Sequence, residues 1–90
     1  MEQSLRPVDV ICVCSADGEL RPLRLRVADE RQESVRIDIE EIVSRKEIPY
    51  VGVEATVFWC RGKLWGRSCL LELKYMFRNH RWYLLRKMQG

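Results

Sequence analysis

Four cysteines are the residues of this chain best suited to chemistry, and they come as two pairs. Cys12 and Cys14 are two positions apart, while Cys60 and Cys69 flank a predicted turn. If that turn is centred at 64–65, Cys60 lies directly opposite Cys69 across a hairpin, where side chains come close. The sequence leaves three interpretations of this second pair open: a disulfide, half of a zinc site, or buried structural thiols.

Zinc is the less favoured of these interpretations. Zinc sites usually take two sulfurs from a tight Cys-x-x-Cys knuckle, whereas Cys12 and Cys14 on a strand would lie on one face about 7 Å apart. The segment 1–7 has neither the basic start nor the apolar stretch of a secretory signal. We therefore expect no metal, no cofactor, reduced thiols and a cytoplasmic protein.

Catalytic patterns are weak. The one histidine, His80, falls in a predicted turn, with no serine or cysteine placed beside it by sequence. The sequence contains no glycine-rich phosphate loop and no His-x-Glu metal pattern. We predict that the protein is not an enzyme and has no catalytic residues.

Alternating apolar residues predict β-strands along most of the chain. The first, 8–14, is apolar on both faces, which indicates a central strand. The closing stretch, 70–77 followed by 81–87, is the clearest hairpin, with its turn at Asn79-His80. The other predicted strands are 23–27, 35–39 and 51–59, with Gly52 at a bulge or bend.

One segment favours a helix. Asp38 offers an N-cap carboxylate with Glu41 three residues on, and Ile39, Ile42 and Val43 share one helical face. We expect a short helical turn near residues 39–46. A sheet packed against one longer helix over 39–47 is the alternative architecture.

These elements predict an all-β fold. Six strands joined by short turns must hide their edges, and in a short chain a six-stranded antiparallel meander does so by closing into an SH3-like or OB-like barrel. A chain of 90 residues buries roughly 60–65% of the surface that its unfolded form exposes, enough for one ordinary core. We expect residues 1–90 to form a single domain.

A family resemblance rests on motifs in a fixed order: Asp17-Gly18-x-Leu20-x-Pro22-Leu23-Arg24-Leu25-Arg26, Val35-x-Ile37, Phe58-x-Cys60, Leu71-Glu72-Leu73-Lys74-Tyr75 and Trp82-Tyr83-Leu84-Leu85. In this order, over most of its length, the chain resembles a group of short uncharacterised proteins from Firmicutes. It is similar, more distantly, to small barrel proteins encoded beside translesion polymerase genes. The resemblance implies a small bacterial barrel. The polymerase-associated group has a Trp-Arg-Gly-Arg-like turn after its first proline, whereas here Arg61-Gly62-Lys63 comes much later.

Charge divides the chain into two halves. Residues 1–48 carry eight basic and eleven acidic side chains, a net charge of −3, and residues 49–90 carry eight and two, a net charge of +6. Aromatic residues are interleaved with the late cations, and cationic grooves with aromatic platforms hold single-stranded nucleic acid. Cations on outer strand faces also protect sheets from edge-to-edge aggregation.

We therefore predict a binding or accessory module that engages a protein partner, with single-stranded nucleic-acid binding as the alternative. No apolar run of about 18 residues is present, so no membrane partner is expected. A homodimer, formed through an exposed strand edge or through Trp65, is a further option. The predicted contact residues are Trp65, Arg61, Lys63, Arg67, Lys74, Arg81 and Lys87.

Overall fold

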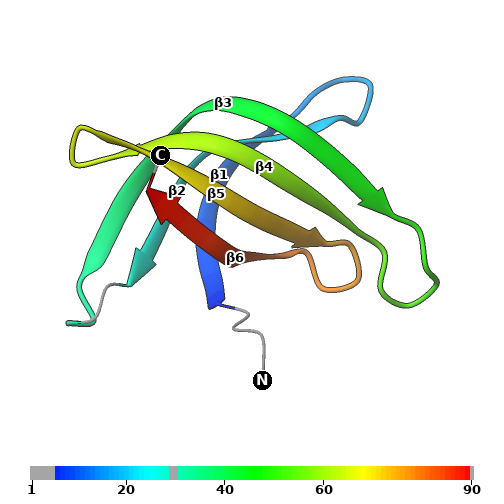
Figure 1. Cartoon of the computed structure of the whole chain (residues 1–90). Helices are drawn as coiled ribbons and strands as arrows, with labels where there is room; N and C mark the ends of the chain where they lie inside the picture. The colour runs from blue at the N-terminus through cyan, green and yellow to red at the C-terminus, as the bar shows by residue number, and fades with distance from the viewer. Residues whose placement is uncertain (1–5, 29–30, 90) are drawn as a thin grey trace.

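The computed structural model describes residues 6–28 and 31–89 as six antiparallel strands that close into a barrel (Figure 1). Each strand pairs with the next along the chain, and β6 pairs back to β1. The predicted all-β barrel built from a meander is confirmed. The strands are β1 (Arg6–Cys14), β2 (Leu20–Ala28), β3 (Ser34–Ile48), β4 (Ala55–Leu64), β5 (Arg67–Met76) and β6 (Arg81–Gln89).

The barrel interior is filled by alternate residues of the strands, because successive side chains point to opposite faces. Phe58 lies at the centre, fully buried, with its ring centroid 5.5 Å from that of Trp82. Alternation in the closing hairpin predicts five inward residues, and four of them, Leu71, Leu73, Trp82 and Leu84, are buried. Tyr75 is half-buried and packs against this core.

The predicted helical turn at 39–46 is wrong, because β3 continues through this segment as a strand. The register of β3 against β4 shifts twice, between Ile39 and Glu41 and between Ile42 and Ser44. Each bulge adds one residue to the strand. Ile39 and Ile42, three apart, therefore both pack against the core. The first bulge, between Ile39 and Glu41, thus produces the three-residue spacing of Ile39 and Ile42 that is typical of a helix.

The fourth strand begins later than predicted. Val51 is 93% exposed and lies in a turn, in which the Val53 amide donates to the Tyr50 carbonyl at 3.0 Å. Gly52 occupies the left-handed region in that turn, with φ of 86°. The apolar alternation from Val51 therefore reflects a turn followed by a strand that starts at Ala55, and the bend expected at Gly52 is confirmed.

The turn between β4 and β5 also differs from the prediction. Leu64 pairs with Arg67, which leaves Trp65 and Gly66 as a two-residue turn. Their φ angles of 52° and 77° are both positive, as in a type I′ turn. The turn centre is thus one residue later than 64–65, so Cys60 faces Leu71 and Cys69 faces Gly62. The two cysteines are not directly opposite one another.

The first strand is not central along its whole length. It pairs with β2 from Asp9 to Cys14 but with β6 only over Arg6–Val8. Ile11 is 56% exposed, so the face predicted to be buried is open to solvent. Both faces of this segment are largely apolar, and for that reason its sequence predicts a central strand.

Arg45 closes the seam between β3 and the start of β2. Its guanidinium donates to the Leu20 carbonyl at 3.0 Å, lies 3.4 Å from the Glu19 carboxylate and stacks over the Phe58 ring at 5.0 Å. β2 pairs with β3 only from Arg24 onward, so this side chain spans a stretch where the two strands are not paired. In this part of the barrel wall the Arg45 side chain, and not a ladder of backbone hydrogen bonds, connects β3 to the start of β2.

Candidate functional site

The outer face of β3 to β6 is organised in rows of four residues, one from each strand. One row contains Lys46, Val57, Lys74 and Tyr83, and the next contains Ser44, Trp59, Glu72 and Arg86. A third contains Glu41, Arg61, Leu70 and Met88. These residues point outward because their neighbours along each strand, such as Phe58 and Leu73, fill the interior.

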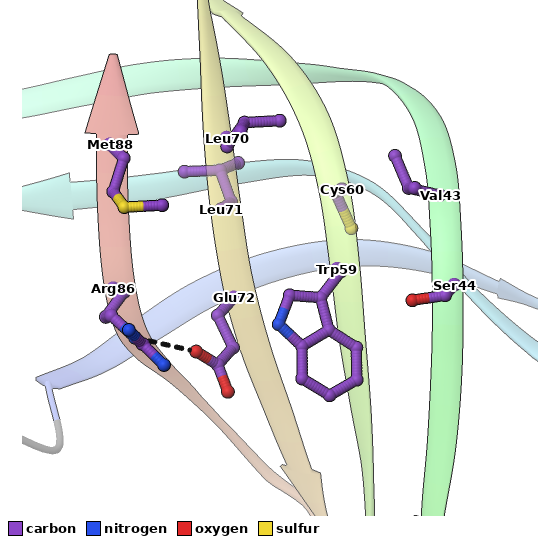
Figure 2. Close-up of a pocket in the computed structure, with 9 residues that line it drawn as sticks. All are labelled: Val43, Ser44, Trp59, Cys60, Leu70, Leu71, Glu72, Arg86 and Met88. Atoms are coloured by element: carbon purple, nitrogen blue, oxygen red, sulfur yellow. Dashed lines mark hydrogen bonds and ion pairs between the residues drawn. The ribbon is translucent and has the colours of Figure 1, made fainter. Parts of the chain in front are cut away.

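A groove of about 510 Å³ crosses the second and third rows. Figure 2 shows Trp59 near its middle, with Leu70 and Met88 toward one end and Val43 on the neighbouring strand. Val43 points outward at the second bulge of β3, where the extra residue breaks the alternation. The lining residues are Val43, Ser44, Trp59, Cys60, Leu70, Leu71, Glu72, Arg86 and Met88.

The apolar lining of this groove is accessible. Val43, Leu70 and Met88 are all more than a third exposed, and Trp59 is partly exposed. A contiguous exposed apolar surface on a small protein marks a site where another molecule binds, whereas single exposed apolar residues are normal. This groove is therefore the strongest candidate contact site among the described residues.

One ion pair borders the groove. The Arg86 guanidinium donates to the Glu72 carboxylate at 2.9 Å, and the Glu72 side chain is largely buried against its neighbours (Figure 2). The two charges compensate each other, so the groove carries no net charge from its own lining. The pair fixes both side chains along one wall and leaves the apolar floor open.

Uncompensated cations lie in the rows beside the groove. Lys46 and Lys74 flank Val57, and Arg81 lies one row further, beside Met76. No salt bridge joins any of these three cations to a carboxylate within residues 6–28 and 31–89. The end of the outer face next to the groove is therefore electropositive.

The predicted contact residues separate into two groups. Arg61, Lys63, Lys74 and Arg81 lie on or beside the outer face, but Arg61 is paired with Glu41 and Lys63 with Glu40. The other three lie elsewhere. Trp65 and Arg67 are at the tip of the β4–β5 hairpin. Lys87 lines a second groove, of about 680 Å³, which Trp65 also lines. The seven residues do not form one continuous stripe.

The sequence did not indicate the four outward-facing apolar residues of the groove: Val43, Trp59, Leu70 and Met88. A signal was present for Leu70, which is apolar between inward-facing Cys69 and Leu71 and so must face outward on a strand. No comparable signal existed for Val43, because its orientation depends on a bulge.

The cysteines are all free thiols, and only Cys12 and Cys14 are exposed. Burial raises the pKa of the Cys60 thiol to about 11. Burial also raises the pKa of Cys69, partly offset by the nearby Lys87 ammonium. Both buried thiols are therefore neutral near pH 7, and neither is an activated nucleophile. Among the described residues no group of three or more potential ligands could hold a metal ion.

His80 sits at the turn between β5 and β6, where its Nδ1 shares a hydrogen bond of 2.9 Å with the Tyr75 hydroxyl. Burial, followed by the nearby Cys12 and Cys14, raises the pKa of Tyr75. The tyrosine is therefore a neutral hydrogen-bonding partner that positions the imidazole at the turn. The part of the chain that the structure covers contains no helix long and apolar enough to span a membrane.

No protein-family model, curated protein or solved structure matches the chain significantly.

Proposed function

We propose that this chain is a protein-binding module whose outer groove receives apolar side chains from an extended, acidic segment of a partner protein. The observation that supports this proposal most directly is the groove itself, with Trp59, Leu70 and Met88 accessible on one sheet face. Fully burying one large apolar side chain contributes about 1.5–3 kcal/mol. Two or three such contacts would give a reversible interaction.

The charges beside the groove support an acidic partner. Lys46, Lys74 and Arg81 form no salt bridge with a carboxylate of the described residues, whereas Arg61 and Lys63, nearer the hairpin tip, are paired. Complementary charges steer association and set register more than they add affinity. A segment with a large apolar residue followed by Asp or Glu matches both features of this face.

Pairing of the cations also bears on the nucleic-acid alternative. Phosphate binding requires cations that are free to replace counterions. Arg61 and Lys63 are engaged with Glu41 and Glu40, and Lys87 lies at a different groove. The row of Lys46, Lys74 and Tyr83 remains the feature that favours an oligonucleotide, so the test includes one.

We also infer a reducing, cytoplasmic setting and a non-catalytic role. Two exposed free thiols, Cys12 and Cys14, are compatible with a compartment that keeps cysteines reduced. The predicted cytoplasmic location also rests on the segment 1–7, of which residues 1–5 lie outside the described residues.

A displayed library of random peptides, selected on the purified full chain, tests the proposal. We expect enriched peptides to combine a large apolar residue with Asp or Glu a few positions away. Binding of a synthetic representative should weaken about tenfold or more in Leu70→Glu, because a carboxylate replaces apolar lining. Leu23→Glu is the matched control, since Leu23 is 40% exposed and Leu70 39%, but Leu23 lies on β2.

Two outcomes would contradict the proposal. Peptide binding that is unchanged in Leu70→Glu would place the site elsewhere. In a second arm, a labelled single-stranded oligonucleotide is titrated at low salt against the same variants. Binding that is lost in Lys74→Glu but retained in Leu70→Glu would favour the nucleic-acid alternative.

A further inference from the structure

One edge of β1 has no strand beside it. From Val10 to Cys14 the strand pairs with β2 on one side, and its pairing with β6 on the other side ends at Val8. Alternate backbone groups of this stretch point away from β2, and the structure pairs none of them with another described strand. Natural proteins usually protect such an edge with charge, proline or a covering loop.

The sequence of this edge lacks two of those protections, charge and proline. Val10, Ile11, Cys12, Val13 and Cys14 contain no charge and no proline, and Ile11 and Val13 are both exposed. Asp9, at the start of the stretch, is already paired with Arg26. A long unprotected apolar edge is a surface suited to strand addition.

We propose that this edge pairs antiparallel with the same edge of a second copy of the chain, with the two-fold axis at Cys12. A two-fold antiparallel pairing sets only the residue on the axis opposite its own symmetry mate and sets its neighbours opposite one another, so like charges near the centre would repel each other. Residues 10–14 carry no charge, so a second copy can pair with them without repulsion. A partner selected by opposite charge would find no charge to recognise there. The arrangement goes beyond the groove and does not depend on its occupant.

The register centred on Cys12 also matches the side chains. It sets Ile11 opposite the second copy's Val13, and Val13 opposite its Ile11. Four β-branched side chains, now exposed, would then form one apolar cluster on the outer face. Cys12 would face its own symmetry mate on the inner face.

The ends of the paired stretch are complementary in charge. Because Val8 pairs with Trp82, Arg81 lies beside Asp9 where the free edge begins, and both line the same small groove. In this register the β1–β2 turn of the second copy lies beside Asp9 and Arg81. The turn carries Asp17, whose carboxylate accepts hydrogen bonds from the Ser15 hydroxyl and the Glu19 amide, and it would approach Arg81.

Disulfide trapping tests the register. Diamide oxidises two thiols to one disulfide and takes up their two protons and two electrons. Cys14→Ser keeps Cys12, whose symmetry-related Cα atoms would be within the 4.4–6.8 Å that a disulfide spans. Cys12→Ser keeps Cys14, whose symmetry mates would be about 13 Å apart along the strand. We expect covalent dimer from Cys14→Ser at a yield roughly tenfold above that from Cys12→Ser.

Sedimentation equilibrium of the full chain provides the second measurement. We expect the unmodified protein to dimerise with concentration, Ile11→Lys to be monomeric, and Leu23→Lys to dimerise normally. Arg81→Glu should weaken the dimer through repulsion of Asp17. A protein that stays monomeric at millimolar concentration would overturn the proposal, and so would equal disulfide trapping through Cys12 and Cys14. A monomer whose β1 edge binds a strand of a different protein would also overturn it. Groove binding could survive any of these results.

Discussion

Trp65 occupies a position in the β4–β5 turn that a bulky residue rarely takes. Its φ is 52° and its side chain is 76% exposed. Type I′ turns favour Asn, Asp or Gly here, because Cβ crowds the backbone at positive φ. The tryptophan therefore costs the hairpin stability at a place where it makes few contacts. A bulky residue at a turn position that disfavours it is consistent with a contact role at the tip.

Replacing Trp65 with asparagine should stabilise the protein. We expect Trp65→Asn to raise the free energy of unfolding by about 0.5–1 kcal/mol, since asparagine adopts positive φ readily. Urea denaturation measures the change, with Arg67→Asn as a control next to the turn. A destabilised Trp65→Asn would show instead that the ring packs against Leu64 more than its exposure indicates.

Cys60 makes stability depend on pH in the alkaline range. Burial raises its pKa from 9.0 to about 11, so the unfolded chain ionises this thiol before the folded chain does. The contribution is fully present below pH 9 and is lost as the pH rises through 11. Two pH units correspond to about 2–3 kcal/mol.

The pH profile of Cys60→Ala checks this effect. We expect wild-type protein to lose about 2–3 kcal/mol more than Cys60→Ala between pH 9 and 11, measured by chemical denaturation at each pH. Cys14→Ala, which removes an exposed thiol, should follow the wild-type profile. Parallel profiles for wild type and Cys60→Ala would mean that the buried thiol ionises as freely as in the unfolded chain.

At the scale of elements, Gly62 allows β4 to approach β3 closely. A Cβ on Gly62 would lie 3.0 Å from the Asp38 carbonyl oxygen and 3.0 Å from Ile37 Cγ2. The backbone oxygen cannot move aside without disturbing the β3–β4 ladder. The glycine is therefore required by packing, not by an unusual φ.

We expect Gly62→Ala to destabilise the barrel by about 1–3 kcal/mol, as overpacking a tight core does. Thermal unfolding of Gly62→Ala beside Lys63→Ala, an exposed neighbour on β4, separates this effect from simple substitution. An unchanged melting temperature would show that β3 shifts at little cost.

The elements also show why the sequence predicted some features and not others. Alternation in the closing hairpin predicted the inward positions of Leu71, Leu73, Trp82 and Leu84, because the register shift of this hairpin comes only at Leu85, after Trp82 and Leu84 have been placed inward. In β3 the bulge between Ile39 and Glu41 sets Ile39 and Ile42 on one face at a spacing that indicates a helix. Alternation cannot distinguish a bulged strand from a helical turn when only two or three apolar residues are involved.

At the scale of the whole molecule, the barrel could be predicted but its contact surface could not. The net charge of +6 in the later half indicated a basic surface, yet Arg61 and Lys63 are paired with glutamates from β3, far earlier in the chain. Such pairing depends on which strands lie side by side. The groove likewise combines residues of β3, β4, β5 and β6, so no single segment of sequence contains it.

Three tryptophans report on three regions, which makes the central claim measurable in one experiment. Trp59 lines the groove, Trp65 lies at the hairpin tip and Trp82 is in the core. In ¹H–¹⁵N spectra of the full chain titrated with a selected acidic, apolar peptide, we expect the Trp59 indole resonance to shift, with those of Trp65 and Trp82 unchanged. A peptide that binds while moving only the Trp65 indole, or neither exposed tryptophan, would contradict the assignment of the groove as the binding site.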